Sequence, residues 1–268
     1  MKKSNSISSF NWESVVDKVV GLEPPKDTFE LRKSFFESVM TDQNGNPIKQ
    51  AGIHDEIQGF IYNLEAKYPN TQLGIIIRAP YNTGKSQQLV GLITYLSTLR
   101  PELEHLVVSA DGGMSSKRIA AVRMLIRKPS YIKWCKSNNV KPLVLSKADT
   151  DSTNKVIFES KNTTGNPSVE AYAVLTKTTG QRCTYLWLDD VCNDDDRTSP
   201  KRRDRVNGRI NNIWIKRAHD KGRIIVVCTP YHPQDANSKL FKSGTFNALQ
   251  ISVTPDKTQY KVEQWINE

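Results

Sequence analysis

The strongest constraint on the fold is a regular alternation of short apolar runs with helix-like segments that begins near residue 54. Apolar residues recur at helical spacing in residues 55–67, again from the Gly-Lys-Ser turn at 84–86 to about residue 99, and again in 114–135. Apolar runs of strand length occur at residues 73–79, 105–110, 155–160, 168–175, 183–191 and 223–230. Strands that alternate with helices are typical of a mainly parallel sheet covered by helices on both faces. The sequence therefore predicts an α/β fold.

The first 50 residues follow a different pattern. The stretches "NWESVVDKVV" (11–20) and "TFELRKSFFESVM" (28–40) carry apolar residues at helical spacing, and "TDQNGNPIKQAG" (41–52) interrupts that spacing with Asn, Gly and Pro. We therefore expect residues 1–50 to form a helical N-terminal lead-in with a loop.

The charge balance favours an anionic partner. The 268 residues carry a formal net charge of +10, spread along the chain, which indicates nonspecific attraction to polyphosphate or DNA rather than base recognition. The longest apolar runs are far shorter than a membrane span, so we expect neither secretion nor membrane insertion. The four cysteines show no CxxC spacing and have no His at ligand spacing. This pattern predicts reduced cytosolic thiols rather than a zinc cage or disulfides. These cysteines are Cys135, Cys183, Cys192 and Cys228.

The stretch "APYNTGKS" (79–86) joins an apolar run to a helix-like pattern. A phosphate-binding loop needs a sharp turn that points backbone N–H groups inward, a flexible cation for the terminal phosphates and a hydroxyl for magnesium. The candidate nucleotide-binding residues here are Asn82, Thr83, Gly84, Lys85 and Ser86. The consensus has Gly where this chain has Ala79, so the strict motif is missed. The alternative is a helix-starting turn with a surface lysine.

Two carboxylates end the apolar run of "TYLWLDDVCNDDD". In this position Asp189 would hold a water of a magnesium shell, and Asp190 would orient or deprotonate the attacking water. Many nucleotide hydrolases have Glu at the second position, so the shorter Asp190 must lie closer or act through a second water. The alternative is that both aspartates merely begin an acidic loop. Residues 194–196 are consecutive, so they cannot all face one metal, and we expect a solvated or capping loop there.

A third polar residue follows the apolar run of "RIIVVCTPYHPQD". A strand that ends in a hydroxyl before proline resembles the sensor strand of motor ATPases, where a polar residue responds to the γ-phosphate. Thr229 is the candidate for this coupling role. A capping threonine before a proline turn is the alternative.

The order of these motifs resembles the ATPase domain of the large terminase subunit, the motor that packages DNA into tailed-phage heads. The resemblance covers about residues 50–245, and the turn "TTGQR" and the segment "TPYHPQD" are more specific than the phosphate loop. The motifs that carry it are "HDEIQGFIYNL", "RAPYNTGKS", "LVVSADGGMSSKRI", "TTGQRCTYLWLDDV" and "RIIVVCTPYHPQD".

The resemblance implies a RecA-like P-loop NTPase fold with an extra strand between the phosphate-loop strand and the metal-aspartate strand. It implies ATP and Mg²⁺ as cofactors, a ring of subunits around double-stranded DNA, and the portal protein and small terminase subunit as partners in the cytoplasm of an infected bacterial host. By position, Lys85 would bind the β- and γ-phosphates, Ser86 and Asp189 the magnesium, and Asp190 would be the catalytic carboxylate. Thr229 would fall in the coupling motif, and Gln58 falls where the family commonly contacts adenine.

Two features depart from the family pattern. Some relatives have an arginine inside the phosphate loop, but residues 80–83 are Pro, Tyr, Asn and Thr, and Arg78 lies in the preceding strand. Arginines that would reach a neighbouring subunit's nucleotide are Arg182, Arg202, Arg203, Arg205 and Arg209. Large terminases also usually continue into a nuclease domain, and the chain stops near where it should begin. We therefore expect ATP hydrolysis but no DNA cleavage from these residues.

These expectations divide the chain into the lead-in (1–50), an ATPase domain (51–245), and a C-terminal strand or tail (246–268) that would link to an absent nuclease domain. The basic segment 200–221, with Trp214 among its cations, and "SSKR" at 115–118 would bind DNA phosphates, or would form solvated helical faces. A packaging motor is the favoured function. The alternatives are another nucleic-acid-dependent ATPase, such as a helicase, and a noncatalytic nucleotide- or DNA-binding module.

Overall fold

The computed structural model describes residues 25–41, 46, 50–149, 152–159, 166–178, 181–254 and 259–267. The helix expected at residues 11–20 lies outside these ranges, and the helix expected at 28–40 is confirmed as α2. In chain order the elements are α2 (Phe29–Val39), α3 (Gly52–Lys67), β1 (Leu73–Arg78), α4 (Lys85–Leu99), β2 (His105–Ser109), α5 (Gly112–Ile126), α6 (Pro129–Ser137), β3 (Lys155–Val156), β4 (Val169–Ala173), β5 (Cys183–Asp189), α7 (Asp195–Thr198), α8 (Pro200–Arg209), a π turn (Ile210–Trp214), a 3₁₀ turn (Ile215–Arg217), β6 (Ala218–Cys228), α9 (Ala236–Lys242), β7 (Asn247–Val253) and β8 (Tyr260–Trp265).

The strands form one eight-stranded sheet in the order β3-β4-β2-β5-β6-β1-β7-β8. The six central strands are parallel to their neighbours, and only the edge pairs β3–β4 and β7–β8 are antiparallel. The expected mainly parallel sheet is therefore confirmed. The strand β6 lies between β1 and β5, in the place of the extra strand that the resemblance implies.

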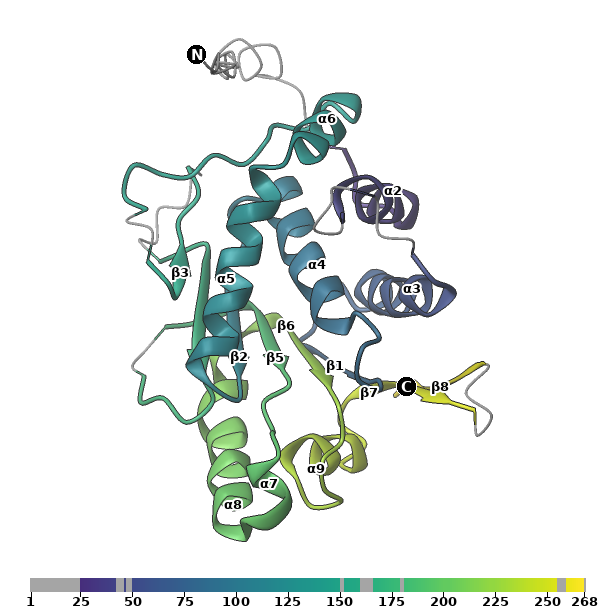
Figure 1. Cartoon of the computed structure of the whole chain (residues 1–268), viewed down its shortest axis with the longest axis vertical. Coiled ribbons are helices and arrows are strands. Elements are labelled where there is room, and N and C mark those ends of the chain that lie inside the picture. The colour runs from purple at the N-terminus through teal and green to yellow at the C-terminus, as the bar shows by residue number, and fades with distance from the viewer. Residues whose placement is uncertain are drawn as a thin grey trace, which may run out of the picture.

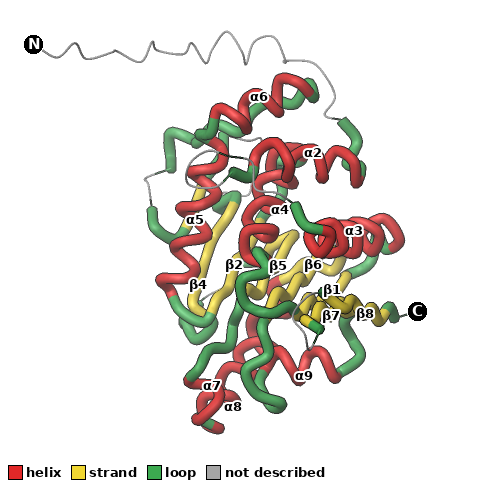
Figure 2. The backbone as a smooth tube through the Cα atoms, turned by 45° about the vertical axis from the view of Figure 1, so that its right-hand side comes forward, coloured by secondary structure: helices red, strands yellow, loops and turns green. Residues whose placement is uncertain are grey.

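Helices cover both faces of this sheet, as the apolar runs predict (Figure 1). Side chains alternate along each strand, so Tyr185 and Trp187 of β5 face α2–α6, while Leu186 and Leu188 face the helices α8 and α9. In Figure 2 the strands run as a central layer between α4 and α5 on one side and α8 and α9 on the other. Two clusters of apolar side chains thus fill the two faces of the sheet. Polar side chains can therefore come together at the ends of the strands.

Several helix starts are fixed by local side chains. Thr28 caps α2 by accepting from the Leu31 amide, and Asp111 caps α5 by accepting from the Met114 amide. Proline at the first position begins α6 and α8, where its missing N–H has no helical partner to lose. The carboxyl ends of β1 and β2 thus pass abruptly into α4 and α5.

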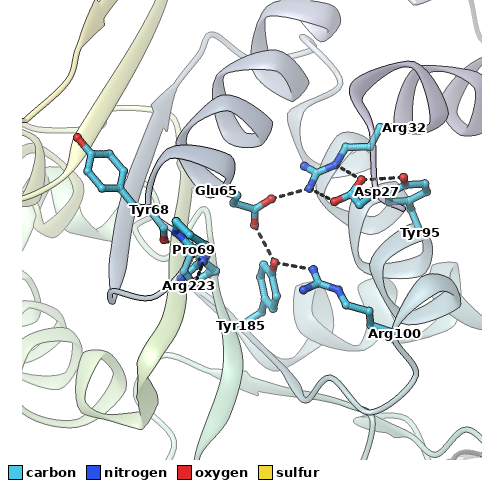
Figure 3. Close-up of polar contacts among 9 residues, drawn as sticks. All are labelled: Asp27, Arg32, Glu65, Tyr68, Pro69, Tyr95, Arg100, Tyr185 and Arg223. Atoms are coloured by element: carbon cyan, nitrogen blue, oxygen red, sulfur yellow. Dashed lines mark hydrogen bonds and ion pairs between the residues drawn. The ribbon is translucent and has the colours of Figure 1, made fainter. Parts of the chain in front are cut away.

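The described part of the lead-in packs against the helices that cover the sheet. Phe36 of α2 lies on α4 at Gly91, where an added Cβ would stand 2.4 Å from the Phe36 ring. A polar network links the same elements: Arg32 bonds to Asp27 and Glu65, and Glu65 accepts from the Tyr185 hydroxyl of β5 (Figure 3). The helix α2 therefore shares a core with α3 and α4.

Some elements differ from the sequence expectations. The strand β6 begins at Ala218 rather than near 223 because its polar start pairs with Cys183 of β5. The run at 155–160 yields only the two-residue β3, and the C-terminal segment forms a β7–β8 hairpin at the sheet edge. The basic segment forms α8 and the two tight turns after it. In the described residues, no helix is long and apolar enough to cross a membrane.

Candidate functional site

The predicted site residues meet at the carboxyl edge of three adjacent strands. In the sheet register Arg78 of β1 pairs with Cys228 of β6, and Val227 of β6 pairs with Asp189 of β5. The residues that follow these positions therefore leave the sheet at the same level. As a result Lys85, Ser86, Asp189, Asp190 and Thr229 lie together, although they are distant in sequence.

The loop between β1 and α4 has the turn that a phosphate loop requires. Gly84, the residue before the helix, has φ 72°, and a Cβ there would lie 3.1 Å from His54 Nε2. Asn82 also adopts positive φ, at 60°, and the Thr83 hydroxyl donates to the Pro80 carbonyl at 2.9 Å. Ala79 lies in the apolar core and its amide donates to Cys228, so its methyl group is accommodated where the consensus has Gly.

Lys85 points into the site and is only 6% exposed. Its Nζ lies 3.5 Å from Asp190 Oδ2 and 3.4 Å from the Pro80 carbonyl oxygen, and 5.4 Å from the centre of the Tyr81 ring. Lys85 is therefore not a surface lysine. A buried ammonium held by a carboxylate and a carbonyl has hydrogen-bond donors that a phosphate can take over.

Asp189 is fully buried, and both of its carboxylate oxygens have partners. The Ser86 hydroxyl donates to Oδ1 at 2.9 Å, and Arg118 Nε of α5 donates to Oδ2 at 2.5 Å. Hydroxyl and carboxylate oxygens are the ligands that Mg²⁺ prefers, so this pair fits a magnesium shell. Groups of three or more His, Cys, Asp or Glu suited to a metal do not occur in the described part of the chain. Any Mg²⁺ here would need water and phosphate oxygens as its other ligands.

Asp190 has an unusual backbone conformation, with φ 44°. Its Oδ1 accepts from the Thr229 amide at 2.8 Å, which fixes the carboxylate above the end of β6. Burial raises the pKa of Asp190 above its ordinary value, and neighbouring Asp189 adds to this rise, while Lys85 opposes it. A carboxylate with a raised pKa is a better proton acceptor, which suits the role expected for Asp190.

Thr229 connects the two halves of the site. Its amide donates to Asp190, and its hydroxyl donates to the carbonyl of Ala79, at the base of the loop, at 3.3 Å. Thr229 is therefore one link between the base of the loop and the Asp190 carboxylate, beside the contact of Lys85 with Asp190.

Gln58 lies in the α3–α4 contact, beside the first turn of α4. It is buried, and its Nε2 donates to Gln88 Oε1 at 3.0 Å. A cavity of about 480 Å³ opens on the other side of the loop, where β1, β6 and β7 end. Its lining includes Pro80, Tyr81, Pro230 and Gln250, but not Gln58.

His54 also contacts the loop, although it is not among the candidate site residues. Its Nδ1 accepts from the Ala51 amide, so its Nε2 carries the proton that is donated to the Thr83 carbonyl at 2.9 Å. The histidine thus braces the loop from the first turn of α3. Nothing in the local spacing around residue 54 signals this contact.

The candidate trans arginines differ in exposure. Arg203 is buried and donates to the Asp196 and Arg197 carbonyls, Arg209 donates to the Thr176 carbonyl, and Arg202 lies near the buried Asp196. Arg182 and Arg205 are exposed. In the acidic loop Asp196 is buried and accepts from the Asn193 amide, while Asp194 and Asp195 are exposed, so the three carboxylates do not converge.

Sequence reasoning placed Arg118 among DNA-binding cations, but the structure places it against Asp189. Nothing in the sequence indicates the contact between Arg118 and Asp189, because the two residues are 71 positions apart and belong to different motifs.

The fold and this edge of the sheet define a mixed α/β protein with a terminase-like fold. The large terminase of bacteriophage HK97 has a similar structure, with a TM-score of 0.52 at 13% sequence identity. The match covers 82% of this chain and 41% of that terminase, so the chain spans less than half of its structural neighbour. At this identity the likeness shows the fold alone. No protein-family model and no curated protein matches the sequence.

Proposed function

We propose that this chain is an ATP-hydrolysing motor domain of the large-terminase type, which drives translocation of double-stranded viral DNA into a capsid. The observation that carries the proposal is the convergence of Lys85, Ser86, Asp189, Asp190 and Thr229 at one sheet edge within a terminase-like fold.

The loop and Lys85 would hold the nucleotide phosphates. Backbone N–H groups at the start of α4 and the buried ammonium supply positive charge where the phosphates bind. Lys85 would exchange its bonds to Asp190 and the Pro80 carbonyl for phosphate oxygens.

Ser86 and Asp189 would hold the magnesium. When bound, the ion supplies charge neutralisation for the phosphates. The hydrogen bond between Ser86 and Asp189 keeps both oxygens facing the same space.

Asp190 would accept a proton from the attacking water, since its pKa is raised and its position is fixed by the Thr229 amide. Release of Asp190 by Lys85 frees the carboxylate for that task. Thr229 would then carry changes at the loop to the catalytic carboxylate through its second bond to Ala79.

The same proposal includes a ring of copies around DNA, with the portal protein and small terminase subunit as partners. Exposed Arg182 and Arg205 are the candidates to reach a neighbour's nucleotide, and an arginine supplied in trans contributes about 10³- to 10⁵-fold in rate. Turnover by an isolated copy is then expected to be slow.

The test is steady-state phosphate release with Mg²⁺-ATP, with and without double-stranded DNA, over a wide range of protein concentration. Wild type should show turnover that rises with concentration or DNA, and Asp190→Asn should reduce it about 100-fold or more. Lys133→Gln, at an exposed position of α6 outside the site and outside the basic segment 200–221, is the control.

Equal background rates for wild type and Asp190→Asn at every concentration, with nucleotide still bound, would make the chain a noncatalytic binding module. Strand separation of a DNA duplex without capsid components would instead favour a helicase.

A further inference from the structure

Arg118 of α5 is the cation that neutralises the buried carboxylate of the site. Its Nε lies 2.5 Å from Asp189 Oδ2, and the Asp189 side chain is 0% exposed while that of Arg118 is 20% exposed. The contact joins the second turn of α5 to the end of β5. The guanidinium therefore lies within reach of any group that binds between Ser86 and Asp189.

Arg118 is held by far fewer bonds than a structural arginine on the same helix. Arg123 donates to Asp149 and to the carbonyls of Ser152 and Lys155. For Arg118, the described part of the chain shows one hydrogen bond, made by Nε, which leaves the two terminal amino groups available. A side chain with one attachment and partial exposure can change partner at low cost.

The charges at the site form two pairs. Lys85 lies against Asp190, and Arg118 lies against Asp189. A fully buried carboxylate without a counter-charge is strongly destabilising, so Asp189 can lose Arg118 only when another cation takes its place. A divalent cation that binds Asp189 Oδ2 would compete with the positively charged guanidinium for that oxygen, while Oδ1 is bonded to Ser86.

We propose that Arg118 is an exchangeable counter-ion: it pairs with Asp189 in the absence of a divalent cation and, when the cation binds, transfers to the terminal phosphate of a nucleoside triphosphate. This inference rests on the proposed nucleotide site. It assigns to this chain's own α5 an arginine in cis, which the loop residues 80–83 do not provide. The planar guanidinium suits both partners, since it binds carboxylate and phosphate oxygens in the same geometry.

The first test measures thermal stability in EDTA and in MgCl₂ without nucleotide, for wild type, Arg118→Gln and Lys117→Gln. Lys117 is exposed on the adjacent position of α5, which makes it a matched control. In EDTA, Arg118→Gln should melt about 5 °C below wild type, because Asp189 has lost its partner. Magnesium should restore most of this loss and should have a smaller effect on wild type and on Lys117→Gln.

The second test measures the affinity for Mg²⁺-ATPγS and for Mg²⁺-ADP. Arg118→Gln should weaken binding of the triphosphate analogue about 10-fold and leave ADP binding nearly unchanged, since only the triphosphate analogue has a γ-phosphate that the guanidinium can bind. Arg118→Lys should restore part of the difference. Lys117→Gln should bind both nucleotides as wild type does.

The outcomes separate this inference from the proposed function. If magnesium stabilises Arg118→Gln no more than wild type, or if both nucleotides weaken equally, Arg118 is a fixed structural partner and the inference is wrong. If wild type binds neither nucleotide while Arg118→Gln still gains stability from magnesium, the proposed function fails, and so does the transfer to phosphate, but the exchange at Asp189 stands.

Discussion

At the scale of single residues, Asp190 combines a backbone of positive φ with a buried charge. Few residues adopt φ 44° without strain, and Asp and Asn are among those that do. The position therefore limits which substitutions test chemistry alone. Asn keeps an acceptor for the Thr229 amide, whereas Ala loses that acceptor and adds strain.

We predict that Asp190→Asn is at least as stable as wild type at pH 7.5. Because folding raises the pKa of Asp190, the wild-type group contributes stability below its unfolded pKa of about 3.8 and loses that contribution as the pH rises through the folded pKa. The free energy of unfolding of the variant, measured by urea denaturation, should therefore gain on that of wild type as the pH rises from about 3.8 through the folded pKa of Asp190. Asp190→Ala should lie about 1–2 kcal/mol below Asp190→Asn. A gap that stays constant with pH would contradict the shifted pKa.

At the scale of elements, the sequence predicts what depends on neighbours along the chain. Hydrophobic periodicity located β1, β2, β5 and the helices between them, and the ends of these strands located Lys85 and Asp189. Local patterns do not predict contacts such as His54 with Thr83 or Arg118 with Asp189, which depend on how α3 and α5 pack beside the sheet.

The contact between β2 and β5 contains a second group that sequence spacing does not reveal. His105 is buried against the rings of Tyr185 and Trp187, and its Nδ1 accepts from Trp187 Nε1 at 3.2 Å. Burial lowers the pKa of His105 to about 3, and the charge of Arg100 adds to the effect. The strand pair is therefore built around a neutral imidazole.

This contact predicts acid sensitivity. A histidine whose folded pKa is depressed supports stability above its unfolded pKa of about 6.5, and that support is lost as the pH falls toward 3, by at most about 1.4 kcal/mol per pH unit. Replacing His105 by Asn should lower the free energy of unfolding at pH 7.5. It should also make that free energy depend less steeply on pH between pH 6.5 and 4.5. His219→Asn, at an exposed position, should leave the slope of wild type. Equal slopes for all three proteins would rule out a neutral buried His105.

At the scale of the whole molecule, a polar network connects the lead-in to the sheet. Arg32 of α2, only 1% exposed, bonds to Asp27 and Glu65, and Asp27 also accepts from the Tyr95 hydroxyl of α4. Figure 3 shows these side chains linked in a chain of bonds that runs from Tyr95 through Asp27, Arg32 and Glu65 to Tyr185 of β5. The carboxylates surround Arg32 closely enough to raise its pKa further despite burial. The network lies near Arg100, which follows α4 at the end opposite the candidate site.

Because this network is buried, removing its central cation should destabilise the entire α/β unit rather than release α2 alone. Arg32→Met should lower the free energy of unfolding by about 3–5 kcal/mol, since Glu65 would remain buried without its counter-charge. The neighbouring Lys33 forms an exposed pair with Asp55, so Lys33→Met should cost less than about 1 kcal/mol. Urea denaturation followed by both tryptophan fluorescence and far-UV circular dichroism distinguishes the cases. A single shared transition at lower urea supports one cooperative unit, whereas an early partial transition would show that α2 detaches independently of the sheet.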